Sequence, residues 1–311
     1  MGYMGRTARL ASKRNRAACW CAARLPFQLV TVVAALSVST LIVMMMTNTA
    51  AGAVMNQGGN PANAIAAPKY QTPGAYRKIN YTGVPKLSGC GFNLKPNMTG
   101  LKTRMVADRL KVHQPYQTMT PLLISKIKEF QKSKKIPANG VVDRRTWLAL
   151  GFAGSDFTAI DCYQHPLRIT PEMSRAQIVE AFVATALEYD GSPYIWGGAN
   201  KPTQGADCSG LVIQALNSIG IDPQPFTTVS HAHPDIPTTR QMYADTGFMH
   251  VPLAEVERGD LLFYKGTTAK IRHVGVYLGN EKIMELVDSG GRVSGWKSPG
   301  GIMPEAVRPI P

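Results

Sequence analysis

Cys208 is the residue of this chain best placed to act as a nucleophile. It is the second residue of the segment 207–210 (DCSG), which opens an apolar run with helical spacing that ends at Gly220, so Cys208 is predicted to lie in the first turn of a helix. A helix N-terminus offers free N–H groups and a positive dipole end, which stabilise a thiolate and can bind an oxyanion. Cysteine is more often a small buried hydrophobic residue, so this predicted position is what points to chemistry.

His273 lies in a segment that has the alternation of a strand. Apolar residues at 274, 276 and 278 alternate with residues 273, 275 and 277, and Gly279 then begins a turn into a returning strand at 282–287. With a three-residue loop, Glu285 would stand opposite Gly275 and diagonal to His273, where a carboxylate can accept the imidazole N–H and fix its tautomer. A two-residue turn would put Glu285 on the other face of the hairpin, so this pairing depends on the loop.

Four segments match a known family in their order and spacing. They are residues 193–198 (PYIWGG), 207–212 (DCSGLV), 258–263 (RGDLLF) and 273–280 (HVGVYLGN). Together they resemble the NlpC/P60 cysteine peptidases, papain-like enzymes that cleave the stem peptides of bacterial peptidoglycan. The resemblance implies that Cys208 is the nucleophile, His273 the base and Glu285 the third polar residue. Family members usually have His, Asn or Gln at that third position, and a carboxylate there would hold His273 more firmly in its charged form.

The resemblance also indicates residues that contact the substrate. It places Tyr194 beside the nucleophile and gives Asp207 and Ser209 a part in positioning the peptide, and Trp196 adds a second large aromatic ring upstream. Asp207 has a second interpretation, because Asp is also a favoured helix N-cap. Substrate contact and helix capping both stay open for this residue.

Residues 165–311 are predicted to form an α+β catalytic domain. Ser174 and Gln177 have the spacing of a capping box and begin an amphipathic helix that ends before Gly191. Because helices come first and strands later, the nucleophile helix is expected to pack on an antiparallel sheet. The papain-like form of this fold is what the family resemblance implies.

Residues 90–162 are predicted to form a small all-α module of three helices. Thr120-Pro121 is a good start for its second helix, and Asp143 can cap a third that ends at Gly151. Segments 127–131, 140–143 and 146–150 resemble the three-helix peptidoglycan-binding module of many wall hydrolases, which implies a tether to the insoluble substrate. Phe130 and Trp147 are expected to anchor the core of the module rather than to stack on glycan.

Residues 1–53 have the pattern of an export signal. They contain no acidic residue, several basic residues and an uncharged apolar stretch from Leu25 to Met46. Cleavage after Ala53 would release a secreted or wall-bound chain. The apolar stretch is also close to the roughly 20 residues that span a bilayer, so an uncleaved anchor on the outer face of the cytoplasmic membrane is the alternative.

Residues 54–89 are rich in Asn, Ala, Gly, Gln and Pro, which predicts a flexible linker. Cys90 and Cys162 bracket the helical module. In an oxidising compartment they can form a disulfide, which would leave Cys208 as the free thiol outside the export segment; two unpaired cysteines are the alternative.

The charge of the chain favours anionic partners. The formal net charge is +14, and +8 remains without the export segment. No segment interleaves aromatic and basic residues as a single-stranded nucleic-acid groove does, so the expected partners are peptidoglycan and other anionic wall polymers rather than nucleic acid. A membrane is expected as a partner only through an uncleaved N-terminal segment.

The segment 231–235 (HAHPD) contains residue types that bind zinc. Three ligands within one proline-containing loop rarely complete a tetrahedral site, so we expect no metal and no other cofactor, and interpret the segment as a surface loop beside the cleft.

These observations predict an exported thiol peptidase of the peptidoglycan stem peptide. The resemblance favours the bond between D-isoglutamate and the diamino acid. Two other classes stay open: an N-acetylmuramoyl-L-alanine amidase or a phage or conjugation lysin with the same three residues, and a non-catalytic wall-binding scaffold.

Overall fold

The computed structural model describes residues 76–233, 238–297 and 301–311 of the 311-residue chain. The predicted export segment and the first part of the predicted linker, residues 54–75, lie outside the described residues. Among the residues that are described, no helix has both the length and the apolar character needed to cross a membrane.

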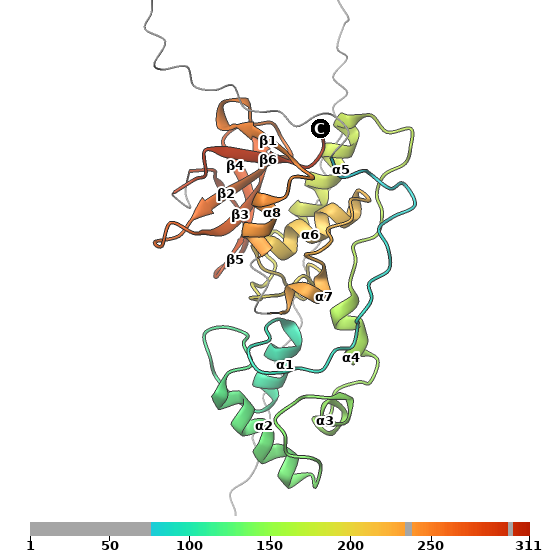
Figure 1. Ribbon diagram of the computed structural model, residues 1–311, viewed down its shortest axis with the longest axis vertical. Helices are drawn as coiled ribbons and strands as arrows, with labels where there is room; N and C mark the ends of the chain where they lie inside the picture. Colours follow the sequence, from blue (N-terminus) through green and yellow to red (C-terminus); the bar gives the residue numbers. More distant parts are fainter. Residues whose placement is uncertain (1–75, 234–237, 298–300) are drawn as a thin grey trace, which may run out of the picture. The chain divides into compact units, whose positions relative to one another are not determined.

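The segment between Cys90 and Cys162 is helical, as the sequence predicts (Figure 1). The predicted N-caps are confirmed: Thr120 Oγ1 accepts the N–H of Leu123 at 3.2 Å, and Asp143 Oδ1 accepts that of Thr146 at 2.7 Å. The elements are α1 (Leu101–Arg109), α2 (Pro121–Ser133), α3 (Arg144–Ala149), α4 (Asp156–Ala159) and the 3-10 helix η2 (Ile160–Cys162).

Trp147 is fully buried at the centre of this module, and its indole N–H donates to the carbonyl of Ala153 at 2.9 Å. Phe130 is half-buried and packs against the same core. Both rings therefore serve the core, as expected, and their apolar area holds the short helices together.

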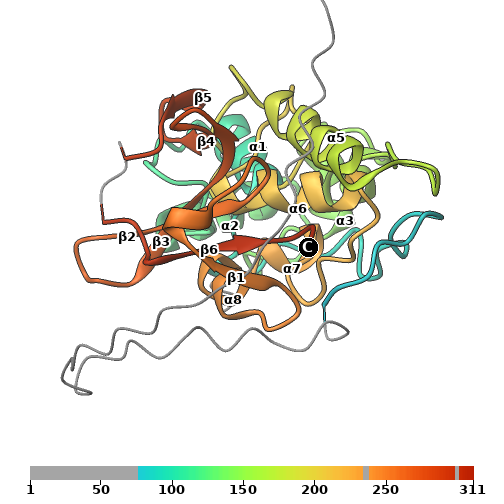
Figure 2. The ribbon, with the colours of Figure 1, turned by 90° about the horizontal axis from the view of Figure 1, so that it is seen from above.

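The larger domain places two long helices beside a sheet. Its helical elements are α5 (Arg175–Leu187), α6 (Cys208–Ser218), α7 (Thr228–His231), α8 (Thr238–Ala244) and the 3-10 helix η3 (Leu253–Glu255). The predicted capping box at Ser174 and Gln177 is present at the start of α5. Helix α6 is buried along its whole length, between α5 and the sheet (Figure 2).

The sheet has six strands in the order β1-β6-β2-β3-β4-β5, with antiparallel neighbours. The strands are β1 (Met249–Pro252), β2 (Leu261–Lys265), β3 (Ile271–Gly279), β4 (Lys282–Val287), β5 (Gly290–Gly295) and β6 (Glu305–Arg308). Apolar residues of α6 and of β3 and β4 share one core, so the helix that begins at Cys208 is fixed against the strand that contains His273. This is the predicted α+β fold.

The hairpin between β3 and β4 has the predicted pairing of Glu285 with Gly275, but a different turn from the one expected. Its turn has two residues, Asn280 and Glu281, both with positive φ (49° and 58°), rather than the three that the pairing was expected to need. A β-bulge between Tyr277 and Gly279 adds one residue to β3 and restores the register. Val276 therefore pairs with Met284, which puts Glu285 opposite Gly275.

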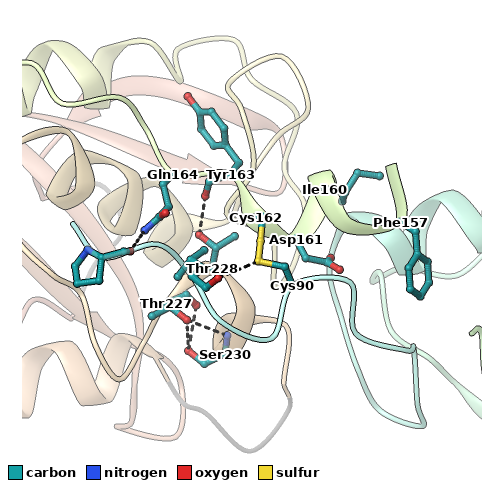
Figure 3. Close-up of a disulfide and its surroundings, with 12 residues drawn as sticks. Cys90, Phe157, Ile160, Asp161, Cys162, Tyr163, Gln164, Thr227, Thr228 and Ser230 are labelled. Carbon is teal, nitrogen blue, oxygen red and sulfur yellow. Dashed lines mark hydrogen bonds between the residues drawn. A yellow bond between two sulfur atoms is a disulfide. The ribbon is translucent and has the colours of Figure 1, made fainter. Parts of the chain in front are cut away.

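A disulfide joins Cys90 to Cys162, with 5.6 Å between the two Cα atoms (Figure 3). Next to it, the side chain of Gln164 donates to the carbonyl of Pro85 at 2.8 Å. Further upstream, Arg77 Nε donates to Asp245 Oδ2 at 2.9 Å. The described part of the predicted linker, residues 76–89, thus contacts Asp245 of the larger domain near its start and Gln164, which directly precedes that domain, near its end.

Candidate active site

Cys208 occupies the first position of α6, where the sequence places it. Its side chain is 6% exposed and it is the free cysteine of the described residues. Asp207 is the N-cap: its Oδ1 accepts the N–H groups of Ser209 at 3.1 Å and Gly210 at 2.9 Å. The sulfur therefore sits at the positive end of a buried helix dipole, which favours a thiolate.

Asp207 is engaged on both oxygens. Its Oδ2 accepts the N–H of Gly197 at 2.8 Å, and His231 Nε2 lies 2.8 Å from its Oδ1. Burial alone would raise the pKa of Asp207, but His231 and the N–H donors outweigh it and hold the pKa below its usual value. Helix capping thus describes the contacts of Asp207; direct contact with a substrate stays a prediction.

His273 lies between Cys208 and Glu285. Its Nε2 is 2.7 Å from Glu285 Oε2, which leaves Nδ1 for the hydrogen bond to Cys208. Burial alone would lower the pKa of His273, but the hydrogen bonds to Cys208 and Glu285 and the negative charges on both raise it to about 10. The imidazolium is therefore the stable form of this ring near neutral pH.

Glu285 has more partners than the sequence indicated. Its side chain is completely buried, and its Oε1 accepts hydrogen bonds from Arg292 Nε at 3.0 Å and Ser294 Oγ at 2.8 Å. Burial would raise the pKa of Glu285, but His273, Ser294 and Arg292 together lower it, so the carboxylate is ionised. Arg292 pairs directly with Glu285 across β4 and β5. The alternation of strand β5 was the signal that could have suggested both residues.

The predicted substrate residues lie around the thiol with different exposures. Ser209 is buried and its hydroxyl donates to Asp207 Oδ1 at 3.0 Å. Tyr194 is half-buried; burial, together with nearby negative groups that include Asp207 and Cys208, raises the pKa of its phenol. Trp196 is 39% exposed. Tyr194 and Trp196 are thus accessible to a ligand, whereas Ser209 faces inward.

A cleft of about 660 Å³ opens at Cys208, the predicted nucleophile. Its lining includes Cys208, Trp196 and Gly197, together with Arg272 from the strand of His273. A cleft of this size accommodates a segment of a peptide.

The segment 231–235, which was expected to form a surface loop, begins with a buried residue at the end of α7. His231 is buried in α7 and bonds Asp207 and Thr238, and His233 packs 5.7 Å from the ring of Phe92. Asp235 lies outside the described residues. Within the described ranges, no group of three or more His, Cys, Asp or Glu residues is arranged to hold a metal ion.

Part of the chain matches a known protein family. Residues 191–305 match the model of the NlpC/P60 family. The chain is 34% identical over 132 residues to the bifunctional muramidase/DL-endopeptidase CwlT of Bacillus subtilis, which is 42% of this chain and 36% of that protein. It is 33% identical over 135 residues to the peptidoglycan endopeptidase RipB of Mycobacterium tuberculosis, with 40% of this chain and 49% of the relative covered. The chain thus spans less than half the length of these relatives.

Two solved structures are also similar. The peptidoglycan hydrolase RipB of Mycobacterium tuberculosis aligns over 73% of this chain and 96% of its own, at 24% identity and a TM-score of 0.35. RipD of the same organism, described as a non-catalytic NlpC/p60 domain protein adapted to peptidoglycan binding, aligns over 42% of this chain and 97% of its own, at 26% identity and a TM-score of 0.31.

Proposed function

We propose that this chain is a peptidoglycan hydrolase that cleaves an amide bond of the stem peptide, because residues 191–305 match the model of the NlpC/P60 family. The observation that carries the proposal is the alignment of Cys208, His273 and Glu285. One imidazole nitrogen of His273 is hydrogen-bonded to the sulfur of Cys208, and the other lies 2.7 Å from the carboxylate of Glu285. Nucleophile, base and orienting group are thus within hydrogen-bonding reach of one another.

The first half of the reaction forms a thioester. The thiolate of Cys208 attacks the carbonyl carbon of the amide, so a C–S bond forms as electron density moves to the carbonyl oxygen. The imidazolium of His273 gives its proton to the departing nitrogen as the C–N bond breaks. The raised pKa of His273 supports this assignment, because it keeps the proton on the ring until the leaving group needs it.

The oxyanion needs a donor that is not already used. Since the N–H groups of Ser209 and Gly210 donate to Asp207, the N–H of Cys208 itself is the first-turn group assigned to the developing oxyanion.

The second half restores the enzyme. Neutral His273 takes a proton from water as the water attacks the thioester carbon, the C–S bond breaks, and the thiolate leaves with the imidazolium re-formed beside it. Glu285 keeps the ring oriented and stabilises its charged form in both halves.

We further propose that the bond cleaved lies between D-isoglutamate and the diamino acid and that the enzyme acts outside the cytoplasmic membrane. The name DL-endopeptidase of the Bacillus subtilis relative supports the first point. The Cys90–Cys162 disulfide supports the second, because such bonds persist in oxidising compartments.

Mass spectrometry of muropeptides digested by the purified chain tests this function, with Cys208→Ala as the inactive control. Fragments split within the stem peptide would support the endopeptidase. Release of the intact peptide from the sugar would identify an amidase instead. Unchanged muropeptides, with Cys208→Ala binding peptidoglycan as well as wild type does, would identify a scaffold and end the proposal.

A further inference from the structure

The helical module contacts the catalytic domain at residues that border the nucleophile. Gly197, whose N–H donates to Asp207, has a φ of +72°, and a Cβ at this position would collide with the side chain of Thr99. The N–H of Thr99 in turn donates to the carbonyl of Ala232 at 3.0 Å. The contact between module and domain therefore lies beside the helix cap that holds Cys208.

Module residues also line the cleft that contains the thiol. Asn97, Thr99 and Thr118 contribute to the same 660 Å³ space as Cys208. All three carry short polar side chains, which can donate to and accept from a peptide backbone.

A second pocket, of about 570 Å³, lies where the module meets Tyr194. The module supplies Arg104, Lys111 and Tyr116 to its lining, and the catalytic domain supplies Tyr194 and Asp288. Tyr194 forms a β-bridge with Ala206, two residues before Cys208, which brings this pocket near the start of α6.

Two contacts connect the pockets. Tyr116, which lines the second pocket, lies 5.5 Å from the ring of Trp196, which lines the first. The side chain of the next residue, Gln117, accepts the backbone N–H of Trp196 at 2.8 Å. Residues 116 and 117 of the module thus hold one of the aromatic rings predicted to contact the substrate.

We propose that the helical module forms one wall of the substrate groove, so that it binds the stem peptide at Cys208 in addition to any tethering of the enzyme to the wall. This inference rests on the proposed function. The two pockets take the parts of the peptide on either side of the scissile amide, and Tyr116 with Gln117 positions Trp196 between them.

The charges of the second pocket fit such a ligand. Arg104 and Asp108 pair with each other at 3.5 Å, and both side chains are exposed enough to exchange this partner for a charged group of the ligand. Lys111 can pair with a free carboxylate and Asp288 with an amino group. A stem peptide with a diamino acid presents both kinds of group, whereas a neutral glycan strand presents neither. The second pocket is therefore assigned to the charged peptide rather than to the sugar.

Assays on soluble and on insoluble substrates distinguish two roles of the module, a wall of the substrate groove and a tether to the polymer. A tether raises the local concentration of enzyme on a polymer and does nothing for a small free fragment. A groove wall contributes to both, because each molecule of substrate must contact it.

The test uses the full chain with two variants and their matched controls. The double variant Tyr116→Ala, Gln117→Ala removes the contacts to Trp196, and its control is Leu122→Ala, an exposed residue of α2 away from both pockets. Arg104→Gln removes one exposed ion pair of α1, and its control Lys126→Gln removes the comparable pair of α2.

Steady-state kinetics on a soluble disaccharide-tetrapeptide are compared with the solubilisation of intact peptidoglycan. We expect KM for the soluble fragment to rise by roughly two- to tenfold in each groove variant, as the loss of one aromatic or charged contact predicts, while both controls match wild type. Unchanged melting temperatures would show that the module stays folded.

Unchanged kinetics on the soluble fragment, with slower solubilisation of intact peptidoglycan, would overturn the inference and leave the module a tether. A rise in kcat/KM would also overturn it, because residues 116 and 117 would then obstruct the groove. If wild type fails to cleave the soluble fragment while Cys208→Ala binds peptidoglycan normally, the proposed function fails instead.

Discussion

At the scale of single residues, the site is a chain of hydrogen bonds that begins at a sulfur and ends at an exposed arginine. Cys208 bonds His273, His273 bonds Glu285, and Glu285 bonds Arg292 and Ser294. The carboxylate is the centre of this chain, because it is completely buried and depends on its three hydrogen-bond partners. We expect the charges of His273 and Arg292, on either side of the carboxylate, to set the two pH limits of the proposed activity.

Replacing Glu285 with glutamine should move the alkaline limit of activity to lower pH. In wild type the imidazolium persists below about pH 10 and is lost above it, because the carboxylate and the thiolate raise the pKa of His273. The Glu285→Gln variant keeps the shape of the side chain but removes one of these charges. We expect kcat to fall on the order of 10²-fold and the alkaline limb of kcat/KM to shift down. A pH profile on a soluble muropeptide measures both, and an unshifted limb would contradict the role given to Glu285.

Replacing Arg292 with alanine should act at the acidic limit instead. Arg292 helps to lower the pKa of Glu285, so wild type keeps the carboxylate ionised below the usual range of Glu and loses it as pH falls. Without the guanidinium the pKa of Glu285 rises toward its ordinary value, and the acidic limb of kcat/KM should move to higher pH. Arg145→Ala, at an exposed arginine of α3, is the control. Identical acidic limbs in the two variants would show that Arg292 does not tune Glu285.

At the scale of elements, local sequence patterns place Cys208 and His273 on their helix and strand, and a β-bulge in β3 sets the register between β3 and β4. The cap at Asp207 starts α6 at Cys208, and His273 lies in β3, whose alternation the sequence shows. The two-residue turn alone would have sent Glu285 to the other face, and the extra residue in β3 prevents this. In the module, α1 depends on a buried ion pair between Lys102 and Asp161, whose side chains are 1% and 5% exposed.

Breaking that ion pair should destabilise the module strongly. Lys102 Nζ lies 2.8 Å from Asp161 Oδ2 and also donates to the carbonyl of Phe92 at 2.7 Å. Lys102→Met leaves an unpaired buried carboxylate and should cost about 3–5 kcal/mol in the free energy of unfolding. The double variant Lys102→Met, Asp161→Leu should recover much of this loss. Urea unfolding measures all three proteins, and a double variant less stable than the single one would refute the explanation.

At the scale of the whole molecule, the disulfide links the two ends of the helical module, and the module contacts residues that lie beside Cys208. The bond spans 72 residues of sequence and encloses the module contacts to Gly197 and Trp196. A disulfide across a loop of this length lowers the entropy of the unfolded chain and so stabilises the folded one. Cys208 takes no part in this bond, because its thiol is free.

Removing the disulfide should therefore unfold the module before the catalytic domain. The chain-entropy relation gives about 4 kcal/mol for a loop of this length, so Cys90→Ser, Cys162→Ser should melt the module at a markedly lower temperature. Above that temperature, kcat/KM on the soluble muropeptide should fall as the groove loses one wall. Calorimetry with activity assays at matched temperatures tests this. A single transition unchanged from wild type would contradict it.

Much of the fold was predictable because its signals are local. The caps at Thr120, Asp143 and Ser174 and the helix that begins at Cys208 depend on neighbouring residues. Such contacts form within one or two turns of chain, so the order of residues suffices to indicate them.

The sequence by itself determined the order of the elements, the helix start at Cys208 and the strand alternation at His273, since short-range sterics and hydrogen bonding set these features. Only the tertiary structure decided that Arg292 and Ser294 hold Glu285, that His231 bonds Asp207 rather than lying on a surface loop, and that Thr99 of the module meets Gly197. These contacts join segments that are distant in the chain or set by strand register. Their distances come from the packing of the whole core, which no local pattern records.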